Sequence, residues 1–136
     1  MIHELRIYTA LPGRMSALLT RFREHTCALF DKHGIRHLAY WTNLIGGASD
    51  ELWYLVEFDS LAHRESAWTA FHSDPAWIRS RDRSVADGPI VARFESRIMQ
   101  PTDFSALGRT PFAPSEEPHR APSSAAIASP GHGEVS

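Results

Sequence analysis

Long apolar runs, paired cysteines and an excess of basic residues are all missing from this 136-residue sequence. No stretch approaches the ~20 apolar residues of a membrane-spanning helix, so neither an integral membrane protein nor a membrane partner is expected. The single cysteine, Cys27, has no partner for an internal disulfide, which favours a reducing compartment. Charged residues interrupt the N-terminal segment, where a signal peptide would be continuously apolar. We therefore expect a cytoplasmic protein.

Positive charge is balanced by negative charge over most of the chain. Residues 1–100 hold 12 Lys and Arg against 12 Asp and Glu, and the net charge of −2 comes from residues 101–136. Nucleic-acid binding requires clustered positive charge, so no nucleic-acid partner is expected. The one local run, Arg79, Arg81 and Arg83, is spread around a helix by its spacing, and we interpret it as a solvated surface.

Motifs for metal, phosphate and nucleophilic chemistry are also missing. The eight histidines form no His-Glu-x-x-His motif and no Cys/His pair at ligand spacing, so no metal site is expected. No Gly-x-Ser-x-Gly elbow occurs, and Gly46-Gly47 lacks the strand–loop–helix context of a phosphate loop. These absences predict a protein without a bound cofactor.

The C-terminal segment differs in composition from the rest of the chain. Residues 111–136 contain five Pro, five Ser and five Ala and show no hydrophobic period. Such a segment buries too little apolar area to offset the entropy lost on ordering it. We predict one folded domain over residues 1–107 and a disordered Pro/Ser/Ala-rich tail over residues 108–136.

Hydrophobic periodicity predicts regular elements throughout the first 107 residues. Apolar residues at helical spacing indicate a long first helix, which Gly34 ends as a left-handed cap. Ser60 and the Asp74-Pro75 pair are typical of helix starts. In chain order, we expect strand 4–8, helix 15–33, strand 35–42, strand 52–59, a helix after Ser60, a short helix from Asp74-Pro75 to Arg83, and strand 90–99.

This order predicts an α+β fold, a ferredoxin-like βαββαβ sandwich with strand order 4-1-3-2 and the helices on one face. The first and last strands are then antiparallel neighbours. Pairing positions that sum to 101 matches opposite charges and keeps them on the helix-free face. The expected pairs are Glu4 with Arg97, Arg6 with Glu95, and Tyr8 with Arg93, and we call these six residues the charged ladder.

The helix-free face would also carry Trp53 and Leu55, which are too apolar to remain in water. Face-to-face packing of two such sheets would bury these side chains and satisfy the charged ladder. We therefore expect a symmetric homodimer. The ladder has a second interpretation, in which Arg6 or Arg93 binds a carboxylate with Tyr8 as a hydrogen-bonding acid.

Several sequence motifs support this fold independently of the strand and helix order. They are His3-Glu4-Leu5-Arg6-Ile7-Tyr8-Thr9 with Pro12-Gly13, Phe30-x-x-His33-Gly34-Ile35, Tyr40-Trp41, Ser66-Ala67-Trp68-x-x-Phe71-x-x-Asp74-Pro75-x-Trp77, and Phe94-Glu95-Ser96-Arg97-Ile98-Met99-x-Pro101-Thr102-Asp103-Phe104. In combination they resemble the signature of the NIPSNAP family over roughly residues 1–107. The resemblance implies a dimeric α+β barrel and no defined reaction. Some eukaryotic members are mitochondrial adaptor or trafficking proteins, but no arginine-rich leader precedes Met1 to favour that location.

A second group of candidate residues is expected between the sheet and the helices. His25 lies three residues after Phe22 and so borders the inward face of the first helix. Tyr54 and Trp68 should point into the same layer, with Trp41 or His37 nearby. These side chains would form a small aromatic-lined pocket with one titratable base.

Two functions remain open from the sequence. The first is binding of a small aromatic or polyketide-like molecule, with cofactor-independent oxygenation or isomerisation if the protein is an enzyme. His25 would be the general base, and Arg6 and Tyr8 the partners of the anion. Related dimeric α+β barrels include cofactor-free monooxygenases, isomerases and haem-degrading proteins, so haem is a further candidate ligand. The alternative is a non-catalytic dimeric adaptor whose tail recruits a protein partner.

Overall fold

The computed structural model describes residues 1–107, so the predicted tail over residues 108–136 lies outside the described residues. Residues Met1–Phe104 form one compact unit. Its elements are β1 (Ile2–Ala10), α1 (Met15–Arg21), the π-helical η1 (Phe22–Thr26), α2 (Cys27–Lys32), β2 (Arg36–Thr42), β3 (Glu51–Phe58), α3 (Leu61–Ser73), α4 (Pro75–Ser84) and β4 (Val91–Met99). No helix within residues 1–107 is long and apolar enough to cross a membrane.

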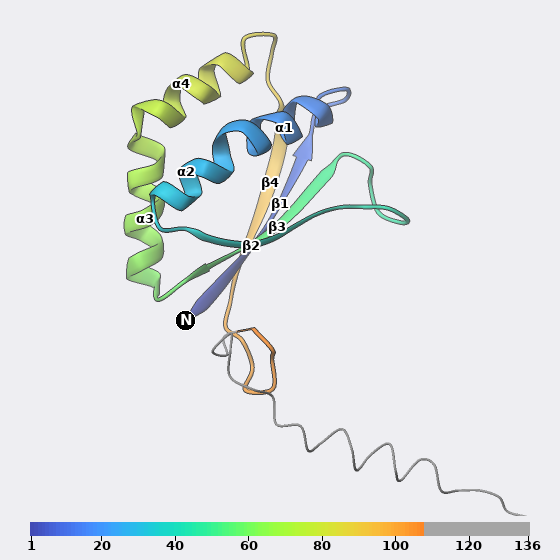
Figure 1. The fold of residues 1–136 in the computed structure, drawn as a ribbon. Coiled ribbons are helices and arrows are strands. Elements are labelled where there is room, and N and C mark those ends of the chain that lie inside the picture. Colours follow the sequence, from blue (N-terminus) through green and yellow to red (C-terminus); the bar gives the residue numbers. More distant parts are fainter. Residues whose placement is uncertain (108–136) are drawn as a thin grey trace, which may run out of the picture. The chain divides into compact units, whose positions relative to one another are not determined.

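The four strands form one antiparallel sheet in the order β2-β3-β1-β4. This is the predicted order 4-1-3-2, counted from the opposite edge. Figure 1 shows the helices gathered on one side of the sheet. The α+β ferredoxin-like prediction is therefore confirmed, with α4 as the expected extra helix.

The first helix is continuous from α1 through η1 to α2, but its middle turn is wider than an α-helix. The Cys27 N–H bonds to the carbonyl of Phe22, five residues earlier, which defines a π-helical turn. Gly34 ends the helix with a φ of +71°, a conformation that side chains disfavour. The Ile35 N–H then bonds back to the carbonyl of Phe30 at 2.9 Å.

Both predicted helix caps are confirmed. The Ser60 hydroxyl accepts a hydrogen bond from the His63 N–H at 3.1 Å. The Asp74 carboxylate accepts one from the Ala76 N–H at 2.8 Å, with Pro75 at the first helical position. Hydrogen bonds from Lys32, His33 and Ala76 lower the pKa of Asp74. The same carboxylate thus fastens the end of α2 to the start of α4.

The predicted register between β1 and β4 is wrong by one residue. The opposed pairs are Glu4–Ile98, Arg6–Ser96 and Tyr8–Phe94, rather than Glu4–Arg97, Arg6–Glu95 and Tyr8–Arg93. Because side chains alternate along a strand, the polar residues of β1 lie on the face opposite to the expected one. Glu4, Arg6 and Tyr8 face the helices and do not belong to a charged ladder.

The physical reason for this correction lies in α3. Arg64 of α3 donates hydrogen bonds to Glu4 and so draws this side chain toward the helices. The two residues are 60 positions apart in the sequence, so charge matching between β1 and β4 alone does not reveal this contact. Arg93, Glu95 and Arg97 remain on the helix-free face, where they pair with positions of β1 other than the predicted ones. Within this set, the ion-pair contact in the described structure joins Arg93 to Glu95 at 3.9 Å.

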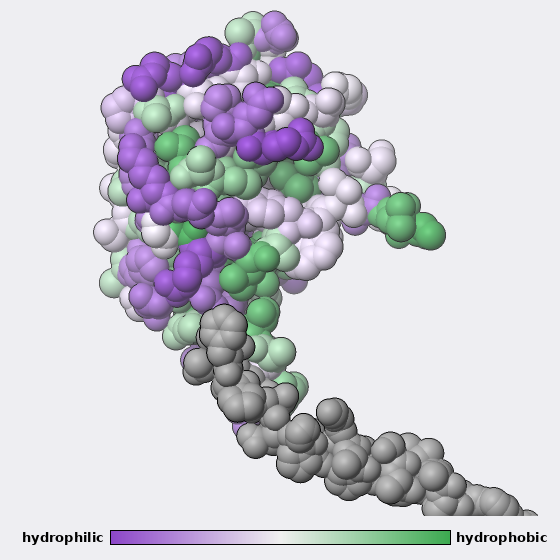
Figure 2. Space-filling model, in the orientation of Figure 1, coloured by the Kyte–Doolittle hydropathy of each residue, from purple (hydrophilic) through white to green (hydrophobic). Residues whose placement is uncertain are grey.

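The helix-free face of the sheet is apolar at its centre. Leu5 lies opposite Leu55 and Ile7 opposite Trp53 across the β1–β3 pair. The connection from β2 to β3 is also apolar and is open to solvent, with Leu44 94% and Ile45 92% exposed. Figure 2 shows an apolar tip projecting from the body at the place of this connection in Figure 1.

Candidate functional site

A buried carboxylate organises the space between α3 and the sheet. Glu4 is completely buried and accepts five hydrogen bonds, from Arg6 Nη1 (2.8 Å), Arg64 Nε (2.8 Å), Arg64 Nη2 (3.3 Å), Trp68 Nε1 (2.9 Å) and Ser96 Oγ (2.5 Å). Burial by itself would raise the pKa of Glu4. The hydrogen bonds and the charge of Arg6 outweigh burial and lower the pKa from the ordinary 4.5 to about 2. Glu4 is therefore ionised at neutral pH and anchors both arginines.

Acid is expected to weaken the fold through this carboxylate. Because the pKa of Glu4 is about 2 in the folded state and 4.5 ordinarily, the unfolded chain takes up the proton first as the pH falls. The stabilising contribution, about 3 kcal/mol, is complete above pH 4.5 and is lost as the pH approaches 2. Urea unfolding across this range measures it. Glu4→Gln should show a smaller loss of unfolding free energy with acid, and an unchanged pH dependence would contradict the assignment.

Arg6 connects this carboxylate to two tyrosines. Its Nε donates to the Tyr54 hydroxyl at 2.8 Å, and its Nη2 donates to the Tyr8 hydroxyl at 3.1 Å. Tyr54 donates in turn to Tyr8 at 3.2 Å. Burial raises the pKa of Tyr54 well above its ordinary value, so Tyr54 keeps the proton that it donates. The Tyr8 oxygen accepts two hydrogen bonds, and within residues 1–107 its own hydrogen has no acceptor.

Aromatic rings hold the Arg6 guanidinium in place. Its central carbon lies 4.6 Å from the ring centroid of Trp68, 4.7 Å from that of Phe94 and 5.5 Å from that of Tyr8. These distances are within the range of cation–π attraction. The guanidinium is therefore fixed between α3 on one side and the β1–β4 pair on the other.

An open cleft of about 550 Å³ adjoins this network. Its floor is the β1–β4 half of the sheet and its wall is α3, and it is lined by Arg6, Tyr8, Arg64, Glu65, Trp68, Thr69, His72, Ser73 and Phe94. Glu4 lies behind this surface and pairs with both arginines, and the exposed Glu65 carboxylate also lines the cleft. The cleft thus combines aromatic surfaces with a hydroxyl donor and a guanidinium, that of Arg6, held in position.

His72 adds a titratable base to the cleft. Its imidazole stacks on Trp68, with ring centroids 5.7 Å apart and planes 22° from parallel. Partial burial, together with the positive charge of Arg6, lowers the pKa of His72 below its ordinary 6.5. The imidazole is therefore neutral at pH 7 and able to accept a proton.

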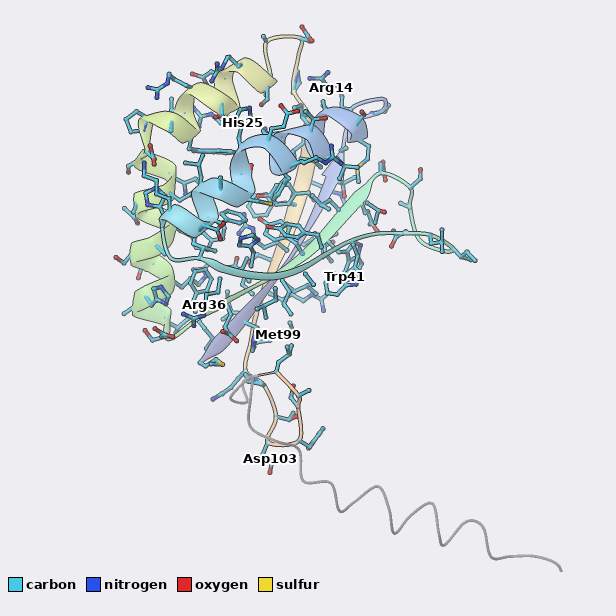
Figure 3. The ribbon with its side chains drawn as sticks, viewed as in Figure 1. Arg14, His25, Arg36, Trp41, Met99 and Asp103 are labelled. Atoms are coloured by element: carbon cyan, nitrogen blue, oxygen red, sulfur yellow. The ribbon has the colours of Figure 1, made fainter. Side chains whose placement is uncertain are left out.

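The network contains four of the site residues predicted from the sequence, namely Arg6, Tyr8, Tyr54 and Trp68. His25 and Trp41 lie elsewhere. His25 lines a different cleft, next to α4. Trp41 is 51% exposed and pairs with Trp53 on the helix-free face, so Figure 3 shows it well away from His25.

Sequence reasoning missed the contribution of α3. Arg64, Trp68 and His72 follow one another at intervals of four residues, which places them on one face of the helix. The sequence predicted Trp68 as a wall of the aromatic pocket, and the same four-residue spacing could have added Arg64 and His72. Phe94 lies opposite Tyr8 and lines the same cleft, but the sequence analysis assigned it no role. Within residues 1–107, no three His, Cys, Asp or Glu side chains gather in a way that could hold a metal ion.

Comparison with protein families gives one match over most of the chain. A family model described as NIPSNAP matches residues 3–106. No curated protein matches the chain. The family match covers the helices, the cleft and the sheet except for its first residue, Ile2.

Solved structures with the same fold include members of that family. A NIPSNAP family protein from Agrobacterium tumefaciens is 28% identical, with a TM-score of 0.69, over 78% of this chain and 97% of that chain. An uncharacterized NIPSNAP domain protein from Burkholderia xenovorans is 22% identical, with a TM-score of 0.68, over 77% of this chain and 98% of that chain. A putative antibiotic biosynthesis monooxygenase from Nitrosomonas europaea shares the fold alone, at 13% identity and a TM-score of 0.54 over 74% of this chain and 98% of that chain.

Proposed function

This chain belongs to the NIPSNAP family, and we propose that it binds a small planar molecule whose oxygen carries or develops negative charge, such as a phenol or an enolisable aromatic ketone. The proposed site is the cleft between α3 and the β1–β4 pair. The observation that carries the proposal is the Tyr8 hydroxyl, which accepts from both Arg6 and Tyr54 and so has its hydrogen left to donate. A donor polarised by a guanidinium suits an oxygen that carries or develops negative charge.

The shape and lining of the cleft support a planar ligand. Its volume of about 550 Å³ lies within the roughly 300–1,000 Å³ typical of small-molecule sites. Tyr8, Trp68 and Phe94 provide aromatic surfaces around the Arg6 guanidinium. A flat ring stacked there would place its oxygen toward the Tyr8 hydroxyl.

The residues also support a reaction, namely proton abstraction from the bound molecule. His72 is neutral at pH 7 and lines the same cleft, so we assign it the role of base that the sequence suggested for His25. The proton passes from the ligand to the imidazole, and the resulting oxyanion accepts a hydrogen bond from Tyr8. Isomerisation and cofactor-independent oxygenation both begin with this step.

Ligand binding is expected to depend on the Tyr8 hydroxyl. Thermal unfolding with a panel of phenols, quinones, aromatic acids and polyketide-like ketones tests this, because a ligand at 100 times its Kd adds roughly 2.7 kcal/mol of stability. Tyr8→Phe removes one charge-assisted hydrogen bond and should weaken binding by about tenfold or more. Tyr40→Phe is the matched control, since its hydroxyl contacts Cys27 and His37 outside the cleft.

The outcomes separate the two functions that the sequence left open. Binding that is lost in Tyr8→Phe and kept in Tyr40→Phe supports the proposal. If no compound in the panel binds, the proposal fails and the dimeric adaptor becomes the better hypothesis. Haem belongs in the same panel, where a shifted visible absorption band would indicate binding of a different class of ligand.

Proton abstraction has its own readout. An enolisable ligand that binds should exchange its acidic C–H for deuterium in D₂O, and proton NMR follows this exchange directly. His72→Gln should slow the exchange while leaving the affinity within about threefold, because the imidazole stacks on Trp68 without a hydrogen bond to Glu4 or Arg6. Equal exchange rates in the wild type and in His72→Gln would contradict the assignment of the base.

We also propose that the protein acts as a homodimer that pairs its helix-free sheet faces. Leu5, Ile7 and Leu55 line the centre of that face, and Trp53 lies beside them. Such an apolar centre bordered by charged residues is typical of a dimer interface. The exposed apolar residues Leu44 and Ile45 would add to the same contact.

A further inference from the structure

A second cleft lies between the first helix and α4, outside the site proposed above. It has a volume of about 540 Å³, and its lining includes Arg14, Arg21, His25, Ser80, Arg83 and Ser84. Within residues 1–107, no Asp or Glu lines this cleft. Figure 3 shows Arg14 and His25 on the same side of the molecule, facing α4. The cleft is therefore positively charged without an internal counter-ion.

Arg21 is the unusual residue of this cleft. Only 7% of its surface is exposed, and within residues 1–107 its Nε has no hydrogen-bond partner. Its Nη1 donates to the Ser84 hydroxyl at 3.3 Å, and its guanidinium carbon lies 5.4 Å from the Trp77 ring centroid. It forms none of the ion pairs found within residues 1–107. Burial without a carboxylate lowers the pKa of Arg21, in contrast to that of Arg6.

A buried arginine of this kind weakens the fold unless a bound group supplies the missing negative charge and hydrogen-bond acceptor. A buried charge without a partner costs several kcal/mol, and an unsatisfied buried N–H adds to that cost. A methionine of similar length would fill the same space without either cost. The arrangement suits an anion that enters the cleft and accepts hydrogen bonds from Arg21.

Two more arginines border the same space. Arg14 donates through Nε and Nη2 to the backbone carbonyls of Pro89, Ser84 and Gly88, at 3.0–3.3 Å. These bonds hold the side chain still and leave its Nη1 available. Arg83 is exposed and forms no ion pair within residues 1–107. Arg79, Arg81 and Arg83 are all exposed, as the sequence predicted, and Arg83 also borders the open cleft.

The local backbone supports a functional role for this region. The π-helical turn Phe22–Thr26 begins directly after Arg21 and contains His25. Single π-turns inside α-helices destabilise the helix and occur frequently at functional sites. Here the wider turn lies beside the cleft that both residues line.

We propose that this cleft binds a phosphate monoester of a small organic molecule. Three arginines and several hydroxyl groups without a carboxylate match a dianion with three terminal oxygens better than a carboxylate with two oxygens. Arg21 contacts the phosphate from the buried end, with Arg14 and Arg83 at the sides. The remaining volume accommodates the organic part, next to His25.

Calorimetric titration of the full chain tests this site with three probes. Phenyl phosphate and inorganic phosphate carry the proposed group, and benzoate is a carboxylate of similar size. We expect phenyl phosphate to bind more tightly than benzoate by at least about tenfold. Arg21→Met and Arg83→Gln should each weaken phenyl phosphate by about tenfold or more, whereas Arg79→Gln, on the same helix but outside the cleft, should not.

Stability separates a binding role of Arg21 from a structural one. Without ligand, Arg21→Met should keep or raise the melting temperature, because it removes a buried charge that lacks a partner. A lower melting temperature with unchanged phosphate affinity would overturn the proposal, and so would a wild type that binds no phosphate compound at millimolar concentration.

A vesicle experiment distinguishes a lipid headgroup from a soluble phosphate monoester. Flotation with phosphatidylcholine vesicles that contain 20% phosphatidic acid presents the same monoester as a lipid headgroup. Binding to these vesicles that is lost in Arg21→Met supports the same phosphate site with a lipid as its source. Binding to phenyl phosphate alone identifies a soluble ligand. Vesicle binding that survives Arg21→Met, without binding of phenyl phosphate, overturns the proposal.

Discussion

Glu4→Gln is expected to lower the free energy of unfolding by about 3–5 kcal/mol, the typical loss when one member of a buried ion pair is removed. The carboxylate is wholly buried and accepts hydrogen bonds from Arg6, Arg64, Trp68 and Ser96. A glutamine amide brings its own N–H donors against these donors and leaves the buried Arg6 without a counter-ion. The network that holds Tyr8 in position should loosen with it.

Urea unfolding followed by circular dichroism measures this loss. Glu65→Gln is the matched control, because Glu65 lies beside Arg64 on α3, lines the same cleft and is exposed. It changes the same charge and should alter stability by no more than about 0.5 kcal/mol. A loss below about 1 kcal/mol in Glu4→Gln would show that the buried network contributes little to the fold.

Leu55→Arg is expected to weaken self-association by about 100-fold or more. Leu55 lies opposite Leu5 and Ala39 on the helix-free face, at the centre of the proposed dimer interface. Burying an unpaired guanidinium between two sheets costs at least about 3 kcal/mol, which converts to this change in Kd. In the isolated chain the new side chain would extend into water, so the fold should survive the substitution.

Sedimentation equilibrium over a range of protein concentrations measures this effect. Ala28→Arg adds the same side chain to an exposed position of α2 and should leave the association constant unchanged. Circular dichroism confirms that both variants are folded. A wild type that stays monomeric at high micromolar concentration contradicts the dimer, and so does a Leu55→Arg variant that associates as strongly as the wild type.

Local signals in the sequence predicted the elements well. Ser60 and Asp74 cap the two helices that they were expected to cap, and Gly34 ends the first helix. Each of these signals acts within a few residues, so the sequence contains all that is needed to recognise it. The π-turn at Phe22–Thr26 was not predicted, because its apolar residues keep nearly helical spacing on either side.

The candidate site was predicted in part. Arg6, Tyr8, Tyr54 and Trp68 were all named from the sequence, but they were divided between two faces of the sheet. The structure brings them together through hydrogen bonds to Arg6 and Glu4. His25 was assigned to this group because it borders the inward face of its helix. Helical phase alone does not reveal whether a residue faces the sheet or a neighbouring helix such as α4.

The sequence by itself determined the family, the order of strands and helices, the order of strands in the sheet and the positions of the caps. The tertiary structure decided which face of β1 carries Glu4, Arg6 and Tyr8. The alternation along this strand fits either face, and charge matching with β4 favoured the wrong one. The correct face depends on Arg64 and Trp68 of α3, which satisfy the buried Glu4 carboxylate only after the helix has packed on the sheet.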